Sequence, residues 1–454
     1  MENNNLQEHD LRVGIMSDVH IGFTGHLDPY YYGLGQVGSQ DKWWEYSLRY
    51  FKNRGVDAIV LPGDMTNCCD YERLGRELTI SHDEMQRLYQ IFQNVFEDTG
   101  VQLITIYGNH DGLLQKDETA NGGTRDHWQE VFGEPYTATV VKSVKGYTFI
   151  GAHWGREAQA GPVLAKAAIE AEGRPVFYIQ HPAIKNTTHG SSPERSVHIF
   201  EEGLNNVKDW ENVIAFSGHE HCPITDERAI WQSVREGEAK CTSVACATMN
   251  YGCPDMAPVN GENLFTKHAL YMTVKGCEVN FERISFWTEE MVALTEGRRT
   301  EQNFSLCTKS AGADWHFVVG GEKPYDFELR YRQAVAPEFP ENAEAGIYCA
   351  DTFAVVRFPA ALPLEKDNDL VHSYCVEAVD SEGKVVSTGW VSTEHHVDHT
   401  TDYYGPSYQV IVPGLKPDTE YTFYVYAMEC YLKKSRFPLK ITRRTLMSGD
   451  TVLK

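Results

Sequence analysis

The sequence predicts a layered α/β domain followed by an all-β sandwich, on two observations. Through residues 11–285, short apolar runs rich in β-branched side chains alternate with segments of helical periodicity, which is typical of α/β layers. After about residue 340 the pattern changes to short alternating stretches separated by turn residues, which is typical of a β-sandwich. We expect domains over residues 1–286 and 336–454, joined by a connecting segment, residues 287–335.

The strands of the first domain are expected where apolar runs of four to six residues occur. These runs are residues 11–16, 57–61, 101–106, 146–151, 175–179 and 213–216. Residues 41–53 and 81–98 repeat apolar side chains every three or four positions, which predicts helices between strands. Residues 269–274 and 278–284, joined at a short turn, predict a hairpin that closes the domain.

The strands of the second domain are expected in stretches of alternating polarity. These stretches are residues 352–358, 373–379, 384–390, 408–412 and 421–428. Residues 412–427 resemble the late strands of a fibronectin type III domain, because Leu415, Pro417, Thr419 and Tyr421 keep the spacing of that family. The resemblance covers about residues 340–445 and implies that Tyr421 is the corner tyrosine of the sandwich.

The overall composition is that of a water-soluble protein, with 42% hydrophobic and 23% charged residues among 454. No apolar run is long enough for a membrane helix, and the polar N-terminus has no signal-peptide core, so we expect a cytoplasmic protein without membrane contact. The formal net charge is −23, and both domains are acidic, which argues against nucleic acid as a partner. The eleven irregularly spaced cysteines are interpreted as reduced thiols.

Five predicted strands end in residue types that bind metals. The residues at these ends are Asp18 and His20, then Asp64, then Asn109 with His110 and Asp111, then His181, and finally His219 with His221. In open α/β sheets the carboxyl ends of the strands face the ligand crevice, so these side chains are expected to converge. Nitrogen and oxygen donors of this kind hold Mn, Fe or Zn, and a cation would offset the cost of burying them together.

Each motif alone is common, but their order along the chain resembles the calcineurin-like metallophosphoesterase superfamily. The resemblance covers about residues 11–285 and implies a four-layer α/β/β/α sandwich with two divalent metal ions at the strand ends. It implies that Asp18, His20, Asp64 and His221 hold the first metal and that Asp64, Asn109, His181 and His219 hold the second. His181 is preferred to His153 and His189 because His181-Pro182 directly follows a strand.

The resemblance also implies how such a site hydrolyses a phosphoester. Two divalent ions bridged by Asp64 would share a water molecule, deprotonate it to hydroxide and take up phosphoryl charge. His110 is expected to act as general acid at the leaving-group oxygen, with Asp111 orienting its ring. We therefore predict a phosphoric ester hydrolase that acts on phosphomonoesters or phosphodiesters of small molecules, nucleotides among them.

The substrate itself is not encoded in these motifs. Long connections near strand ends often carry specificity, and here they are residues 26–38, 113–128 and 183–198. Candidate substrate contacts on or near them are Tyr30, Tyr31, Tyr32, Trp154, His189 and Arg195. The second domain carries no catalytic motif, and we expect it to act as a scaffold whose protein or carbohydrate partner is not specified.

Three alternatives remain open at this point. A nuclease would use the same motifs, but the acidity of both domains opposes it. A metal-stabilised binding protein, whose sandwich docks on a carbohydrate or protein, would hold metals without turnover. A thiol hydrolase would use Cys222 beside His219 and His221, but no oxyanion arrangement accompanies it.

Overall fold

The structure is a computed structural model of the 454-residue chain. It describes residues 10–21, 39–66, 79–111, 124–191, 209–246, 248–250, 252, 266–300, 303–362, 371–393 and 406–449. The chain divides into two compact units, and each is considered by itself. The first unit comprises Met1–Ile224, Ala229–Asp255 and Phe265–Phe327. The second comprises Thr225–Arg228, Met256–Leu264 and Glu328–Lys454.

The first unit contains two mixed sheets within the described residues. In the first sheet the strand order is β12-β11-β10-β1-β2-β3, and β13 also pairs with β11. These strands are β1 (Leu11–Ile15), β2 (Ala58–Leu61), β3 (Gln102–Thr105), β10 (His268–Lys275), β11 (Glu278–Ser285), β12 (Lys309–Ser310) and β13 (Trp315–Val318). The parallel strands β1, β2 and β3 carry three of the predicted motifs at their carboxyl ends.

The second sheet of this unit has the order β4-β5-β6-β7-β9-β8. Its strands are β4 (Thr139–Val144), β5 (Tyr147–Ala152), β6 (Val176–Ile179), β7 (Val213–Ser217), β8 (Ile230–Trp231) and β9 (Thr242–Ala245). Strands β5, β6, β7 and β9 run parallel, so the ends of β6 and β7 deliver His181 and His219 to the same edge. The hairpin β10–β11 closes the first sheet, as the sequence predicts.

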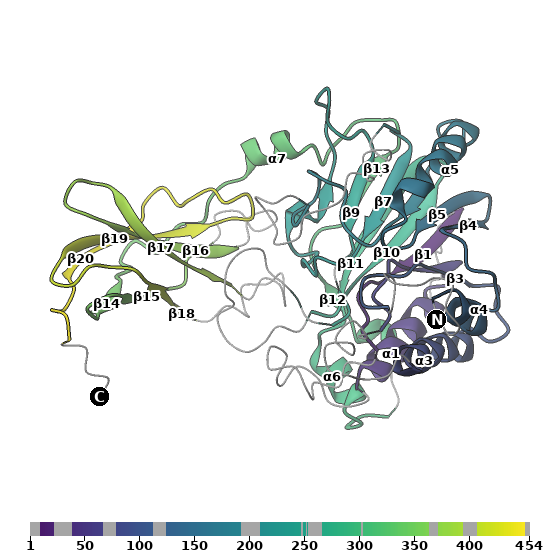
Figure 1. The fold of residues 1–454 in the computed structure, drawn as a ribbon, viewed down its shortest axis with the longest axis horizontal. Coiled ribbons are helices and arrows are strands. Elements are labelled where there is room, and N and C mark those ends of the chain that lie inside the picture. Colours follow the sequence, from purple (N-terminus) through teal and green to yellow (C-terminus); the bar gives the residue numbers. More distant parts are fainter. Residues whose placement is uncertain are drawn as a thin grey trace, which may run out of the picture. The chain divides into compact units, whose positions relative to one another are not determined.

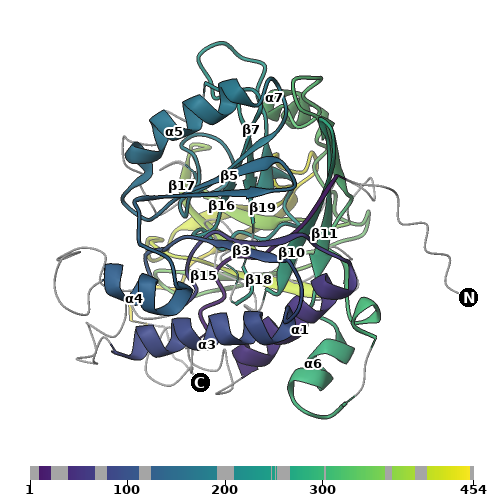
Figure 2. The ribbon, with the colours of Figure 1, turned by 90° about the vertical axis from the view of Figure 1, so that its right-hand side faces the viewer.

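Helices cover the outer faces of the two sheets. They are α1 (Ser39–Asn53), α3 (Thr79–Val95), α4 (Thr124–Phe132), α5 (Glu157–Glu170) and α6 (Glu289–Thr295). Figure 2 shows α5 on one outer side and α1 with α3 on the other, with both sheets between them; Figure 1 gives the same elements from the side. The predicted four-layer α/β/β/α sandwich is confirmed.

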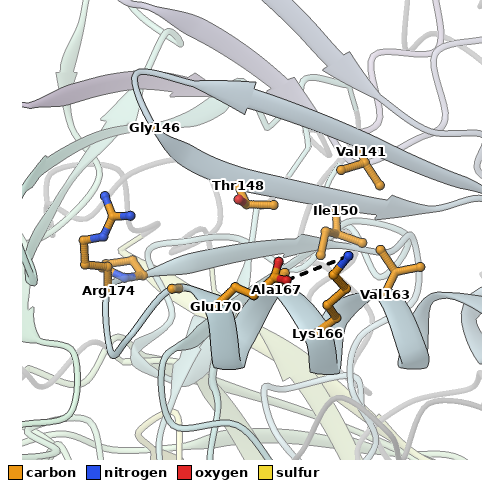
Figure 3. Close-up of a pocket in the computed structure, with 11 residues that line it drawn as sticks. Val141, Gly146, Thr148, Ile150, Val163, Lys166, Ala167, Glu170 and Arg174 are labelled. Carbon is orange, nitrogen blue, oxygen red and sulfur yellow. Dashed lines mark ion pairs between the residues drawn. The ribbon is translucent and has the colours of Figure 1, made fainter.

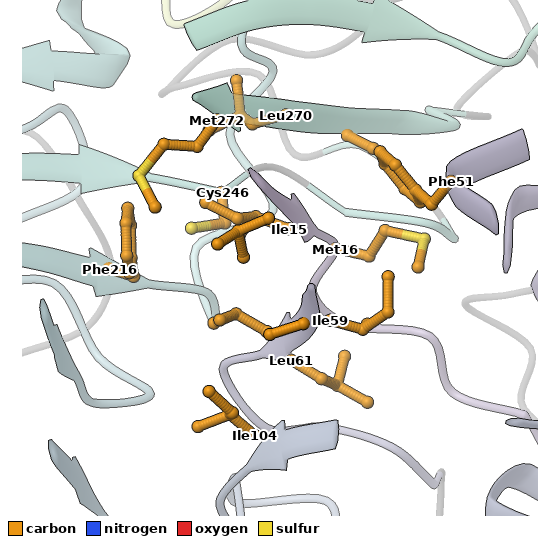
Figure 4. Packing of buried hydrophobic residues seen from close by; sticks show 14 of the residues in the cluster. Ile15, Met16, Phe51, Ile59, Leu61, Ile104, Phe216, Cys246, Leu270 and Met272 are labelled. Carbon is orange, nitrogen blue, oxygen red and sulfur yellow. The ribbon is translucent and has the colours of Figure 1, made fainter. Parts of the chain in front are cut away.

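The core between the sheets is built by the alternate residues of the strands. Ile15 of β1 points inward and lies near Met272 of β10 and Phe216 of β7 (Figure 4). Gly14 points the other way, toward α1, where an added Cβ would come within 2.7 Å of the Phe51 ring. Glycine at this position therefore allows α1 to pack closely on β1, which stabilises the strand whose end carries Asp18.

Part of the expected connecting segment, residues 287–335, forms elements of the first unit. Helix α6 lies there, and β12 and β13 pair with β11 and extend the first sheet. Strand β12 has only two polar residues, and β13 alternates buried and exposed side chains over just four residues, so neither was expected from an apolar run. Helix α7 (Phe327–Gln333) follows where the second unit begins.

The second unit is a β-sandwich of the fibronectin type III kind, as the sequence predicts. Its sheets have the orders β14-β15-β18 and β17-β16-β19-β20. The strands are β14 (Gly346–Cys349), β15 (Ala354–Pro359), β16 (Ser373–Val379), β17 (Val385–Ser392), β18 (Ser407–Val412), β19 (Glu420–Met428) and β20 (Leu439–Arg444). Residues from both sheets form one apolar core that includes Val356, Tyr374 and Val425.

The corner tyrosine expected at Tyr421 is present. The side chain is buried, and its hydroxyl oxygen accepts a hydrogen bond from the backbone N–H of Lys416 at 3.1 Å. A tyrosine that bonds to the backbone a few residues upstream is the corner motif of such sandwiches. The bond fixes the turn that leads into β19.

A buried ion-pair cluster within the second unit includes the short segment Thr225–Arg228. The guanidinium of Arg228 donates to Asp226 Oδ2 at 2.7 Å and lies 3.2 Å from His372 Nε2. Arg330 pairs with Glu227 in the same cluster. Arg228 and Asp226 are 4% and 1% exposed, so this ion pair is buried.

The described residues bear on membrane-spanning helices and on the state of the cysteines. Within them, no helix has the length and the apolar content needed to cross a membrane. The eight cysteines among them are free thiols, and seven of these are buried.

Candidate metal centre

Six of the predicted metal ligands lie together in two overlapping groups. Asp18, His20, Asp64 and His221 form one group, and Asp64, His181 and His219 form the other. Within each group the ligand atoms lie within 4.8 Å of one another, and every residue but His219 is buried. Asp64 belongs to both groups, so its carboxylate lies between them.

In the first group, two carboxylates and two imidazoles lie within contact distance of one another. His221 Nε2 lies 3.1 Å from Asp18 Oδ1, and His20 Nε2 lies 3.3 Å from His221 Nε2. His20 Nε2 also lies 3.7 Å from Asp64 Oδ2. These residues come from the ends of β1, β2 and β7, so three strands of two sheets build the group.

The second group is centred on His181. Its Nε2 lies 3.1 Å from Asp64 Oδ2 and 3.0 Å from Asn109 Oδ1, which places Asn109 beside the group. The ring of His219 lies 5.0 Å from the ring of His181. The expected second set of ligands is therefore brought together at the ends of β2, β3, β6 and β7.

Backbone carbonyls outside the groups orient two of the imidazoles. His20 Nδ1 lies 3.1 Å from Thr66 O, and His181 Nδ1 lies 2.7 Å from Pro62 O. A carbonyl can only accept, so Nδ1 carries the proton and a neutral ring keeps the Nε2 lone pair toward the site. Histidines that ligate metals are usually fixed in this way.

The electrostatics of the groups favour a positive charge at their centre. Burial opposes protonation of His181, but the carboxylates of Asp64 and Asp18 outweigh it and raise the pKa of His181 to about 10. Burial and the neighbouring His110 lower the pKa of His20 to about 3. Burial acts against ionisation of Asp64, yet the adjacent His181 and His110 hold the pKa of that carboxyl well below its usual range. In the metal-free site a proton on His181 offsets the carboxylate charge, and a divalent cation would replace that proton.

Five of the ligand positions have a backbone conformation that is uncommon for residues other than glycine. The φ values are 52° at Asp18, 47° at His20, 51° at Asp64, 69° at His219 and 51° at His221. A left-handed conformation at such a residue costs about 1 kcal/mol or more and persists only where surrounding contacts impose it. The concentration of these residues at one edge of the unit is typical of a functional site.

Two glycines allow the strand-end turns to approach one another. A Cβ on Gly108 would come within 2.2 Å of Asp64 Oδ1, and a Cβ on Gly218 within 2.0 Å of Ser17 Oγ and 2.4 Å of Asp18 Oδ2. The glycines of the Gly-Asn-His-Asp and Gly-His-Glu-His motifs are therefore required by packing against the carboxylates. The two motifs therefore supply metal ligands and also the glycines that let neighbouring strand-end turns pack closely.

The predicted catalytic residues lie beside the first group. His110 is half-buried, its ring lies 4.7 Å from that of His20, and its backbone N–H donates to Asp64 Oδ1 at 2.8 Å. The carboxylate of Asp111 accepts from the backbone N–H groups of Gly108 at 2.7 Å and Thr66 at 2.8 Å. Asp111 thus ties two strand-end turns together, and its expected role in orienting the His110 ring stays a prediction.

The alternative histidines and the candidate substrate contacts have different positions. His153 is buried among the rings of Tyr107, Trp128 and Tyr136, which gives it a packing role. His189 is buried and belongs to neither group. The half-buried Trp154 lies 5.0 Å from the ring of His219, beside the second group. Residues 30–32 and Arg195 lie outside the described residues.

A pocket elsewhere on the first unit does not belong to this centre. It has a volume of about 290 Å³ and lies between α5 and the β4–β5 hairpin (Figure 3). Gly146, Arg174 and Pro175 line it, and these residues precede β5 and β6. The pocket therefore opens at the amino ends of these parallel strands, whereas the ligands follow their carboxyl ends.

Two buried residues near the site carry no sequence motif. Gln40 in α1 and Lys267, just before β10, hydrogen-bond to each other, and Gln40 also donates to Val19 O in the turn that carries Asp18 and His20. A lysine that is only 2% exposed is unusual. The helical periodicity of residues 41–53 gave no indication of this contact, because it joins residues that are distant in the chain.

A family resemblance follows from the sequence together with this geometry. Residues 11–223 match the calcineurin-like phosphoesterase family, which confirms the resemblance of this part of the chain to that superfamily. The members of that family that the resemblance describes hold a dinuclear metal centre, and the donors found here fit one. No curated protein matches the chain.

Several solved structures have limited similarity to the chain. A dimetal phosphatase from Danio rerio is 9% identical, with a TM-score of 0.40, over 61% of this chain and 96% of its own. A purple acid phosphatase from yellow lupin seeds is 14% identical, with a TM-score of 0.39, over 60% of this chain and 51% of its own. A human fibronectin type III domain is 21% identical, with a TM-score of 0.17, over 26% of this chain and 94% of its own. At these TM-scores the similarities carry no argument about activity.

Proposed function

We propose that this protein hydrolyses phosphomonoesters or phosphodiesters of small molecules with two divalent metal ions, Mn, Fe or Zn. The observation that supports the proposal is the shared carboxylate of Asp64, which belongs to two adjacent groups of metal-binding side chains. When bound, the two ions would supply charge stabilisation for the phosphoryl oxygens and an activated water molecule. Asp18, His20, Asp64 and His221 would hold the first ion, and Asp64, Asn109, His181 and His219 the second.

His110 is proposed as the proton donor to the leaving group. The backbone N–H of His110 donates to the carboxylate of Asp64, and the backbone carbonyl of His110 accepts from the hydroxyl of Thr66 at 2.9 Å. Both bonds fix the main chain, so the imidazole is presented from a rigid support beside the first group. An imidazole in that position can give a proton to the departing oxygen.

The substrate is proposed to be a small molecule. The formal net charge of −23 disfavours the polyanionic backbone of nucleic acid, while bound cations can reverse the local field at the centre itself. Trp154, beside the second group, offers an aromatic surface for the organic part of such a substrate.

The proposal is tested with p-nitrophenyl phosphate and bis-p-nitrophenyl phosphate. Metal-stripped protein is assayed after addition of Mn, Fe, Zn or Mg, with metal content measured in parallel. We expect metal-dependent release of p-nitrophenol. Asp64→Ala should lose both bound ions and the activity, because Asp64 belongs to both groups. His110→Ala should keep both ions but lose roughly 100-fold or more in kcat, the usual contribution of a general acid.

The control is His316→Ala, which removes an exposed histidine of β13 and should change neither metal content nor kcat. If the wild-type protein binds two ions but hydrolyses neither substrate with any metal, a metal-stabilised binding protein becomes the better interpretation. If His110→Ala keeps full activity, His110 is not the proton donor.

A further inference from the structure

The turn from Ser17 to Val19 is held by hydrogen bonds to three consecutive carbonyl oxygens. Ser17 O accepts from the backbone N–H of Met249 at 2.9 Å, and Asp18 O accepts from the hydroxyl of Thr248 at 3.2 Å. Val19 O accepts from the side-chain amide of Gln40 at 2.7 Å. The main chain between the ligands Asp18 and His20 is therefore fixed by donors from two distant parts of the chain.

Lys267 hydrogen-bonds to two of the residues that supply these donors, Gln40 and Met249. Its ammonium donates to Gln40 Oε1 at 2.9 Å and to Met249 O at 2.6 Å. The amide of Gln40 also donates to Met249 O, at 2.8 Å. The three groups thus form a closed ring of hydrogen bonds, and all of them are buried. Because the ammonium can only donate, Gln40 must turn its oxygen to Lys267 and its NH₂ group to Val19.

The held turn contains two of the strained ligand positions. Asp18 and His20 have φ values of 52° and 47°, which side chains other than glycine rarely adopt. Such a conformation needs surrounding bonds that impose it. On the opposite side, the backbone N–H of His20 donates to Asp64 O at 3.0 Å. The ring of Gln40 and Lys267 supplies further support through the bond from Gln40 to Val19 O.

We propose that Gln40 and Lys267 form a positioning pair that presets the conformation of Asp18 and His20, and thereby the affinity for the first metal ion. The pair acts through the carbonyls of Val19 and Met249. This inference rests on the proposed metal centre. Residues that support metal ligands from outside typically change metal affinity by about 10–100-fold.

Two variants remove different parts of the pair. Lys267→Met keeps the aliphatic stem and removes the ammonium. Gln40→Glu keeps an acceptor for Lys267 but removes the amide that donates to Val19 O. The matched controls are Lys52→Met, which loses a bond from lysine to the carbonyl of Val95, and Gln90→Glu, which makes the same change on the exposed side of α3.

Binding of Mn²⁺ and Co²⁺ to the metal-free protein is measured by calorimetry and by the visible absorption of Co²⁺. In Lys267→Met and Gln40→Glu we expect one ion to bind about 10–100-fold more weakly and the other to bind as in the wild type. The weakened ion should be the one that His221→Ala also weakens. Lys52→Met and Gln90→Glu should match the wild type.

A second measurement tests the pair without any metal. In the metal-free protein, hydrogen exchange at the His20 amide should be about tenfold or more faster in either variant than in the controls, because the turn opens more often. Unchanged exchange and unchanged affinity in both variants would overturn the proposal, as would equal weakening of both ions. A wild-type protein that does not bind two ions would instead overturn the proposed function, and the exchange data would still decide the role of the pair in holding the turn.

Discussion

At the scale of single residues, Lys267 is the least expected feature of the first unit. Its side chain is 2% exposed, its ammonium lies 5.4 Å from the ring of Trp43, and burial lowers the pKa of the amine to about 7. A buried charge of this kind reduces stability whenever it must stay protonated. The protein therefore keeps an unfavourable group at a position where it supports the turn of Asp18.

The pKa of Lys267 predicts a pH dependence of stability. In the unfolded chain the amine has its ordinary pKa of 10.5, so between about pH 7 and 10.5 the unfolded state binds more protons than the native state. Stability contributed by this group therefore rises with pH through that window, by at most about 1.4 kcal/mol per pH unit. The measurement is denaturant unfolding of wild-type protein and Lys267→Met in a chelating buffer from pH 7 to 9.5.

The difference in unfolding free energy between the two proteins isolates Lys267, since other titrating groups are shared. As the pH rises, we expect the unfolding free energy of the wild type to increase relative to that of Lys267→Met. Lys52→Met serves as the control, and its difference from the wild type should not change with pH. A constant difference for Lys267→Met would show that the buried amine keeps its ordinary pKa.

At the scale of elements, the strand-end turns of the two sheets are packed against each other with no spare space. The turn after β7 reaches the turn after β1, where the N–H of His219 donates to Asp18 Oδ1 at 3.1 Å. Gly218 lies at this crossing, and its missing side chain leaves room for Ser17 and Asp18. The position of the Asp18 carboxylate thus depends on the absence of a side chain at Gly218, in the turn after β7.

Gly218→Ala should displace the Asp18 carboxylate and weaken one of the two metal ions. The added Cβ would come within 2.4 Å of Asp18 Oδ2, a contact that cannot exist without movement. We expect about tenfold or weaker binding of one ion, measured by titration of the metal-free protein with Mn²⁺. Gly100→Ala is the control, because nothing lies within 4 Å of its added Cβ. Two ions bound as tightly as in the wild type would refute the role of this packing.

At the scale of the whole molecule, the two units are not consecutive in the chain. Residues Thr225–Arg228 belong to the second unit, although they lie between stretches of the first. Within the second unit, Arg228 is 4% exposed and pairs with Asp226 and His372. A cut near residue 336 therefore separates these residues from most of the unit to which they belong.

We expect the chain truncated at residue 335 to unfold at a lower temperature than the first unit does in the full chain. In the full chain, Arg228→Met should lower the unfolding temperature of the second unit, because breaking a buried ion pair costs roughly 3–5 kcal/mol. Scanning calorimetry measures both effects. Arg444→Met is the control, since its partner Asp418 and the arginine itself are both more than half exposed and such pairs contribute little.

If the truncated chain melts at the temperature of the first unit in the full protein, residues 225–228 do not depend on the second unit. The two units could then be treated as independent along the chain.

Much of the architecture was predictable from local patterns. The alternation of apolar runs with helical periodicity indicated both the layered α/β unit and the sandwich, and the spacing around Tyr421 indicated its corner. Residues 309–310 and 315–318 were not recognised as strands, because the first has only two polar residues and the second alternates buried and exposed side chains over just four.

The candidate ligands could be named from the sequence because each directly follows a strand, and parallel strands end at one edge. Tertiary structure alone decided how they are held. The bond from Gln40 to Met249 joins residues 209 positions apart, and Asp111 bonds to the backbone of Thr66, 45 positions away. Such bonds depend on which turns the folded sheets bring together. A pattern within one segment of chain cannot contain that information, since neither partner is chemically unusual until the other lies beside it.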